Sequence, residues 1–247
     1  MYRCEAVSAE AFVQQLACNL VNHGYWFYTV GHVPPGKDPR AVDRKLIDGY
    51  GLEISKWQRA RLKAKGHAKL SYLRHERFFV LLATAGEHIF YQREGRVRDV
   101  RREPIVFDGY SIGCSKGSDG RYHASVKIHA DTFNERRAYL LGLALHRSAE
   151  TLVQAFQSVR FTPYARVRRQ LLRLLREVNE CRRIGGFELI PLRALRLRRE
   201  IVQVFDRNPA AAGQSSSSFE SSSSPCASVS SCSEIVKNTN RSVLHGR

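Results

Sequence analysis

Apolar residues recur along the first 206 positions at two different spacings. Spacings of three and four predict helices over residues 8–22, 39–48, 56–65, 132–158 (in two pieces) and 162–184. Runs dense in aromatic and β-branched residues predict strands over residues 25–30, 68–73, 77–84, 88–92, 104–107, 110–114 and 122–128. Short turns separate most of these strands, which favours antiparallel pairing. We therefore expect an α+β fold, an antiparallel sheet packed by helices with a long basic helix near its C-terminal end.

The composition changes sharply after the last apolar segment. Residues 213–233 include 12 serines and lack the periodic apolar positions that a core requires. We expect a single basic domain over residues 1–206 and a disordered Ser-rich tail over residues 207–247.

Two of the predicted helices resemble a helix-turn-helix. Asp38 is expected to cap the first, Ser55 the second, and glycines lie between them. On the second helix Lys56, Arg59 and Lys63 share one face, and Trp57 is expected to anchor the helix so that the cations meet phosphates or base edges. The plainer interpretation is a helical hairpin with a solvated charged face.

The charge distribution favours a polyanionic partner. The chain has 40 Lys and Arg against 23 Asp and Glu, a formal net charge of +17. Residues 160–199 alone hold 12 Arg and 3 Glu, and residues 56–69 are basic without any acid. In the predicted helix 162–184, a row of arginines follows the helical repeat: Arg166, Arg169, Arg173 and Arg176. Clustered cations bind phosphates and release counterions, so DNA or RNA is the expected partner.

Several classes of protein lack support in the sequence. No apolar run approaches the roughly 20 residues that span a bilayer, and the N-terminus has no features of a secretory signal, so we expect a cytoplasmic protein. Phosphate-binding loops, dinucleotide fingerprints and zinc-type cysteine pairs are absent from the sequence, so no small-molecule cofactor is expected.

An enzyme is the first alternative. Tyr164 opens an arginine-rich helix, and a tyrosine that forms a phosphotyrosyl link with DNA needs nearby cations. Rolling-circle initiators and tyrosine transposases place such a tyrosine beside a sheet with a His-hydrophobe-His strand, which this chain lacks. Under this alternative a divalent metal would be held by histidines: His75, His88, His123 and His129. In the plainer interpretation Tyr164 packs a helix start and the histidines are ordinary sheet residues; we expect a binding protein rather than a nicking or strand-transfer enzyme.

The aromatic run Tyr25–Tyr28 has two interpretations as well. It can offer stacking platforms for single-stranded bases, or it can be core. An RNP-like motif is missing, and most residues of a two-sided strand are buried, so we favour core.

One long set of residues resembles a group of uncharacterised bacterial proteins. It comprises Tyr25-Trp26-Phe27-Tyr28, Gly31, Lys37-Asp38-Pro39, Asp43, Lys45-Leu46-Ile47, Ser55-Lys56, Arg59, Arg61, Tyr72-Leu73-Arg74 and the run from Arg77 to Thr84. The resemblance covers the predicted folded part. It implies a bacterial cytoplasmic source and attaches no activity.

The sequence therefore predicts a nucleic-acid-binding protein that contacts phosphates through Arg- and Lys-rich helices. The second alternative is a basic interaction protein that docks an acidic partner.

Overall fold

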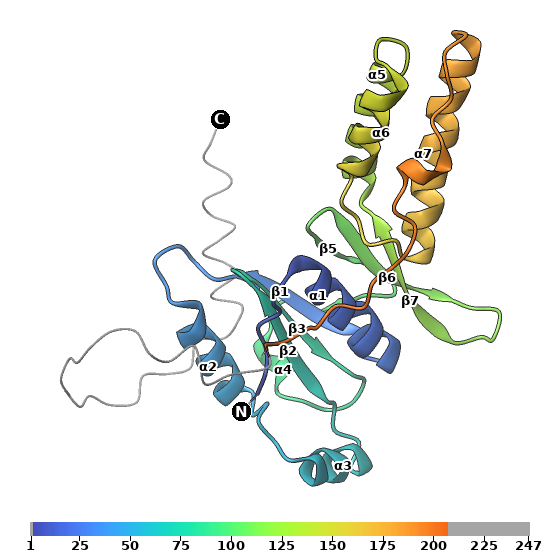
Figure 1. The fold of residues 1–247 in the computed structure, drawn as a ribbon. Coiled ribbons are helices and arrows are strands. Elements are labelled where there is room, and N and C mark those ends of the chain that lie inside the picture. Colours follow the sequence, from blue (N-terminus) through green and yellow to red (C-terminus); the bar gives the residue numbers. More distant parts are fainter. Residues whose placement is uncertain (1, 207–247) are drawn as a thin grey trace. The chain divides into compact units, whose positions relative to one another are not determined.

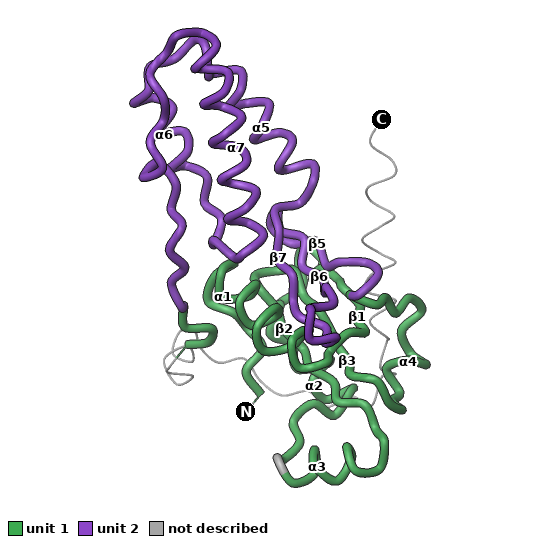
Figure 2. The backbone as a smooth tube through the Cα atoms, turned by 90° about the vertical axis from the view of Figure 1, so that its right-hand side faces the viewer, with its two compact units in different colours: residues 1–100, 202–247 green, residues 101–201 purple. Residues whose placement is uncertain are grey.

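The structure, a computed structural model, describes residues 2–206, without the side chain of Lys56. The predicted tail, residues 207–247, lies outside the described residues. The chain forms two compact units, Met1–Val100 with Val202–Arg247 and Arg101–Ile201 (Figure 2). The single domain expected for residues 1–206 stays a prediction, and each unit is described by itself below.

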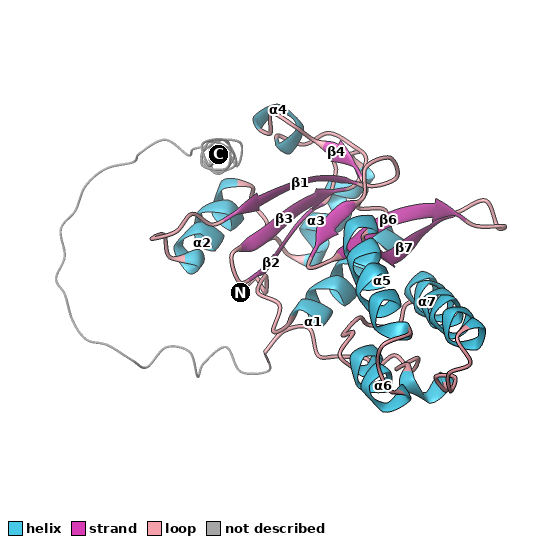
Figure 3. Ribbon diagram, turned by 90° about the horizontal axis from the view of Figure 1, so that it is seen from above, coloured by secondary structure: helices cyan, strands magenta, loops and turns pink. Residues whose placement is uncertain are grey.

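The α+β class is confirmed: helices accompany two antiparallel sheets (Figures 1 and 3). In unit 1 the sheet order is β2-β3-β1-β4. Its strands are β1 (Phe27–His32), β2 (Leu70–His75), β3 (Phe78–Ala83) and β4 (Arg98–Asp99). Its α-helices are α1 (Ala9–Gln14), α2 (Pro39–Gly49), α3 (Lys56–Ala64) and α4 (Phe90–Arg93).

Two sequence predictions differ from unit 1 as observed. Residues 88–92 were expected to be a strand, but α4 is a short helix, because the His88 Nδ1 accepts a hydrogen bond from the Phe90 backbone N–H and Phe90 is fully buried. A short apolar run cannot distinguish the two states. The helix expected over residues 8–22 is α-helical only in α1, which Ser8 caps; a π-helix (Gln15–Leu20) and a 3₁₀ turn (Val21–His23) follow.

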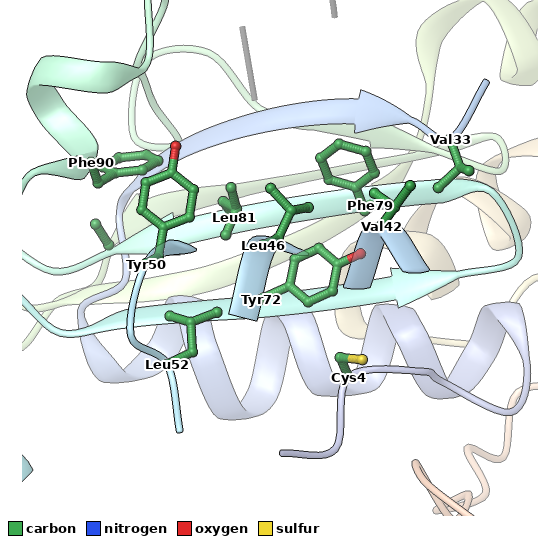
Figure 4. Packing of buried hydrophobic residues seen from close by; sticks show 11 residues of the cluster. Cys4, Val33, Val42, Leu46, Tyr50, Leu52, Tyr72, Phe79, Leu81 and Phe90 are labelled. Atoms are coloured by element: carbon green, nitrogen blue, oxygen red, sulfur yellow. The ribbon is translucent and has the colours of Figure 1, made fainter. Parts of the chain in front are cut away.

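One face of the four-stranded sheet carries the core that α2 covers (Figure 4). Phe79 and Leu81 of β3 project from this face and pack with Leu46 of α2. The Phe79 ring lies directly over Gly31 of β1, where an added Cβ would come within 2.4 Å of the ring. Gly31 is therefore required by packing, because any side chain there would displace the aromatic ring that fills the core.

α2 is also held to the sheet by a buried polar cluster. Asp43 of α2 accepts hydrogen bonds from Arg74 Nε at 2.8 Å, from Arg74 Nη2 at 2.9 Å and from the Tyr72 hydroxyl at 2.5 Å. Glu5 adds a second carboxylate 3.1 Å from Arg74 Nη2. Burial and the charge of Asp43 raise the pKa of the Cys4 thiol to about 12, so this thiol stays protonated.

The opposite face of the same sheet is covered by α1. Phe12 of α1 packs edge-on against Phe78 of β3, with ring centroids 5.7 Å apart. The Gln14 side chain donates to the Val202 carbonyl at 2.8 Å and accepts from the Val202 N–H at 3.2 Å. After unit 2, the chain therefore rejoins unit 1 at Val202, which is hydrogen-bonded to α1.

Unit 2 consists of a three-stranded sheet and three α-helices. The sheet order is β5-β6-β7, with β5 (Ile105–Phe107), β6 (Tyr110–Lys116) and β7 (Tyr122–Ile128), the last as predicted. The helices are α5 (Ala130–Ala144), α6 (Ala149–Gln157) and α7 (Ala165–Ile184), and a 3₁₀ turn (Leu192–Ala194) follows. α7 packs against both β7 and α5.

Polar side chains of α7 fix it within unit 2. The Gln170 side chain pairs with both backbone groups of Ile128, at 2.8 and 3.1 Å. Arg182, only 2% exposed, donates to the carbonyls of Ala144, Arg147 and Glu188. α7 begins later than expected, because the Thr162 N–H donates to the Tyr110 hydroxyl at 2.8 Å and is held outside the helix.

Replacement of Asp43 tests the buried pair. Asp43→Asn keeps the volume but leaves Arg74 without its buried counter-charge, so the free energy of unfolding should fall by about 3–5 kcal/mol. Urea denaturation measures this loss. Asp48→Asn, exposed on the same helix, is the matched control and should change stability by less than about 0.5 kcal/mol. Equal stability of the two variants would contradict a structural role for the pair.

Candidate nucleic-acid interface

α3 is a helix with local capping contacts at both of its ends. Ser55 and Gln58 form a reciprocal capping box at its start, and Gly66, with φ +81°, ends it in the left-handed conformation. None of the described side chains of α3 is buried. Trp57, which was expected to anchor the helix, is 83% exposed, so that expectation is wrong.

The helix-turn-helix is not confirmed. Six residues, 50–55, separate α2 from α3, whereas the motif joins its helices by a turn of roughly three to four. Tyr50 and Leu52 in this connection are buried in the core beside α2. The connection therefore packs on the sheet and α3 does not.

A cleft of about 770 Å³ lies beside α3 within unit 1. The π-helix and the turn after it contribute Asn19 and His23, and the residues just before β1 contribute Tyr25 and Trp26. Lys63 comes from α3, and the segment after α3 supplies His67 and Lys69. The eleven described residues that line it include no carboxylate; they are Asn19, His23, Gly24, Tyr25, Trp26, Lys63, Gly66, His67, Lys69, Thr84 and Ala85.

The basic wall of the cleft is held by the turn that follows β3. Lys69 and Thr84 exchange hydrogen bonds: the Thr84 Oγ1 accepts from the Lys69 N–H at 2.9 Å, and the Lys69 carbonyl accepts from the Thr84 N–H at 2.9 Å. Gly86, at φ +133°, approaches so closely that an added Cβ would lie 2.4 Å from the Gly66 carbonyl oxygen. The turn thus fixes the backbone that carries His67 and Lys69.

The aromatic wall is held by backbone bonds at the entry to β1. The Tyr25 N–H donates to the Leu20 carbonyl at 3.3 Å, and the Trp26 carbonyl accepts from the Val100 N–H at 2.8 Å. Burial raises the pKa of the Tyr25 hydroxyl, and the positive charge of Arg59 on α3 partly opposes this. Lys63 lines the same cleft as the aromatic pair, whereas the Arg59 guanidinium donates to the Ile54 carbonyl at 3.1 and 3.2 Å.

Unit 2 carries the predicted arginine row on the exposed face of α7. Arg166, Arg169, Arg173 and Arg176 are all exposed, while Val167, Leu171, Leu174, Leu175 and Val178 are buried. At 1.5 Å per residue the row spans about 15 Å. Within the described part of the chain, three of the four make no ion pair with a carboxylate: Arg166, Arg169 and Arg176.

Arg173 is the member of the row that is paired. Its Nε donates to the Glu177 Oε1 at 2.8 Å, and Arg137 Nε of α5 donates to the Oε2 at 2.5 Å. Partial burial would raise the pKa of Glu177, but hydrogen bonds from Arg173 and Arg137 outweigh it and hold that pKa below its usual value. Glu177 therefore stays ionised and neutralises part of the row.

The four histidines proposed as metal ligands are not brought together within either unit. In unit 1, His75 ends β2 and His88 follows β3, at opposite ends of a hairpin about 17 Å long. In unit 2, His123 and His129 lie at opposite ends of β7, about 20 Å apart. Each has a local polar neighbour: the Ala6 carbonyl, the Phe90 N–H, Asp119 and Asp131 respectively. Among the described residues, no three His, Cys, Asp or Glu side chains form a group that could hold a metal ion.

Tyr164 is the N-cap residue of α7 and is 9% exposed. The guanidinium of Arg199 lies 4.7 Å from its ring centroid. A nucleophile must reach a phosphodiester, so this burial favours the interpretation in which Tyr164 packs the start of the helix. Tyrosine-dependent nicking stays an untested prediction, and so does its divalent metal.

Comparison with protein families, with curated proteins and with solved structures found no match. In the part of the chain that the structure describes, no helix has both the length and the apolar character needed to cross a bilayer.

The sequence indicated Lys63, the basic segment 56–69 and the run Tyr25–Tyr28 as separate features, and nothing in it showed that they share a cleft. His67 and Lys69 join the site through the turn at 84–87, and Asn19 and His23 join it through the π-helix and the 3₁₀ turn after it. The bond between Lys69 and Thr84 spans 15 positions of sequence, and the other segments of the cleft are farther apart still, so no local pattern reports the site. Within the run Tyr25–Tyr28, Tyr28 is 1% exposed core, as favoured, whereas Tyr25 and Trp26 line the cleft. Stacking of bases on this run stays a prediction.

Glu177→Gln tests how far the arginine row is neutralised. Releasing Arg137 and Arg173 should tighten DNA binding and steepen the dependence of log K on log salt by up to about 0.9 for each added phosphate contact. Titrations at several salt concentrations measure both quantities. Glu135→Gln, an equal charge change at an exposed position of α5, is the control; identical behaviour of the two variants would contradict the idea.

Proposed function

We propose that this protein binds nucleic acid, with the cations of α3 and α7 contacting phosphates. The proposal rests mainly on the exposure and composition of α3. All of its described side chains are exposed, and the helix has several cationic residues and no acidic residue. A helix whose described side chains are all exposed does not contribute them to the core, so packing does not dictate their composition. Cations without carboxylates suit a polyanion.

α7 supports the same proposal from unit 2. Its residues include seven arginines and two glutamates, a net charge of +5. Arg182 is used to hold unit 2 together, and Arg173 and Arg183 pair with Glu177 and Glu180. The remaining arginines are exposed, and an Arg fork matches the geometry of phosphate oxygens.

Removing the row tests the proposal. In the full chain, simultaneous replacement of Arg166, Arg169, Arg173 and Arg176 by Ala should weaken binding to DNA and RNA of any sequence. At least three unpaired contacts are lost, so the salt slope should fall by about 2.7 for duplex DNA or about 2.1 for single strands. Fluorescence anisotropy with labelled DNA and RNA at several salt concentrations gives both quantities.

The matched control removes the same charge from scattered exposed positions: Arg44, Arg102, Arg136 and Arg193. If this control loses as much affinity and slope as the row variant, binding depends on net charge and not on the row. If the wild-type chain binds neither DNA nor RNA, the proposal fails. A basic protein that docks an acidic partner would then be the better description.

A further inference from the structure

The cleft of unit 1 combines features that the general proposal does not use. Its lining combines the aromatic residues Tyr25 and Trp26 with Lys63, His67 and Lys69. Its volume of about 770 Å³ falls within the range of clefts that bind small organic molecules. A purely electrostatic phosphate contact needs neither a cleft nor aromatic side chains.

We propose that this cleft binds single-stranded nucleic acid, with an unpaired base stacked against Tyr25 and Trp26 and its flanking phosphates held by Lys63 and Lys69. The inference rests on the proposed function and names the substrate class of the α3 region. Every nucleobase has a π-face, so stacking on aromatic side chains binds single strands with little dependence on sequence.

The geometry selects against duplex. In a duplex both faces of each base are covered by neighbouring bases, so a base reaches an aromatic wall only when it is unpaired. Tyr25 and Trp26 are partly buried inside a cleft and are not presented on a flat surface. Only a base free of its stack can therefore enter.

The charges favour a polynucleotide over a neutral ligand. Lys63 of α3 and Lys69 both line the cleft with the aromatic pair, and the backbone of Lys69 is fixed by its bonds to Thr84. Cations on two separate segments that share a cleft with two aromatic residues match a chain that carries a phosphate on each side of every base.

One glycine in the lining of the cleft has a left-handed backbone conformation. Gly24, at φ +88°, ends the 3₁₀ turn in the left-handed conformation and lines the cleft. Nothing lies within 4 Å of the position that a Cβ would take there, so the glycine leaves this side of the cleft clear. A side chain at this position would project into open space beside the aromatic pair and would be strained as well.

The first experiment uses intrinsic fluorescence and leaves the cleft intact. The chain has two tryptophans, so Trp57→Phe makes Trp26 the only one. Oligothymidine DNA and oligouridine RNA of about ten nucleotides should quench Trp26 saturably, and a duplex of the same length should not. Saturable quenching by either single strand supports the proposal. The oligomer that binds more tightly shows whether the cleft prefers deoxyribose or ribose.

The second experiment measures affinity in full-length variants. Trp26→Leu should weaken single-strand binding about 5- to 150-fold, which corresponds to the loss of one stacked base. Trp26→Phe should restore most of the affinity, because it keeps an aromatic face. Duplex affinity and the salt slope should be unchanged, which separates stacking from phosphate contact; circular dichroism checks that each variant is folded.

Several results would overturn the inference. The first is quenching of Trp26 by duplex, and the second is a folded Trp26→Leu variant that binds single strands as tightly as the wild-type protein. The third is saturation by thymidine monophosphate at the same concentration as the oligomer. The fourth is displacement of the oligomer by polyglutamate at matched charge. If wild-type protein binds nucleic acid with a steep salt slope but ignores strandedness and Trp26, the proposed function stands and this inference falls. If it binds none, both fall.

Discussion

The buried pair between Asp43 and Arg74 is the interaction on which the architecture of unit 1 depends. It joins α2 to the edge strand β2, and the Tyr72 hydroxyl completes the coordination of the carboxylate. A charged guanidinium that is 1% exposed would be costly without this carboxylate. Burial by itself would lower the pKa of Arg74, but the hydrogen bonds and charge of Asp43 outweigh that and raise it, so the arginine stays charged.

Because this pair holds α2 on the sheet, α3 is left at the surface of unit 1. With α2 packed on one face of the sheet and α1 on the other, both faces are covered without α3, and the core cluster includes no described residue of α3. Every described side chain of α3 is exposed to solvent. Packing therefore does not dictate the composition of its described positions, which leaves them available for binding.

Unit 2 shows how one residue type takes several roles in the same helix. The buried Arg182 donates to three backbone carbonyls, Arg173 is held by a carboxylate, and Arg166 and Arg169 are exposed. A count of net charge would treat all of these arginines as equivalent. Only the exposed and unpaired ones have the geometry to meet a phosphate without first breaking another bond, so they are the ones on which the proposed phosphate contacts depend.

The sequence by itself determined what depends on near neighbours. Ser8, Asp38 and Ser55 cap helices as expected, β7 has the predicted bounds, and the exposed arginine row follows from helical spacing. These features are local because capping, periodicity and strand alternation act over a few residues.

Tertiary structure decided the rest. It placed the short helix α4, with Phe90 buried, where a strand was expected, and it exposed Trp57 and buried Tyr164. It separated Tyr25 and Trp26, which line the cleft, from the core residue Tyr28. It also assembled the cleft from segments 19–26, 63–69 and 84–85. Burial and long-range contact depend on which distant surfaces meet, and neither periodicity nor composition of a single segment carries that information.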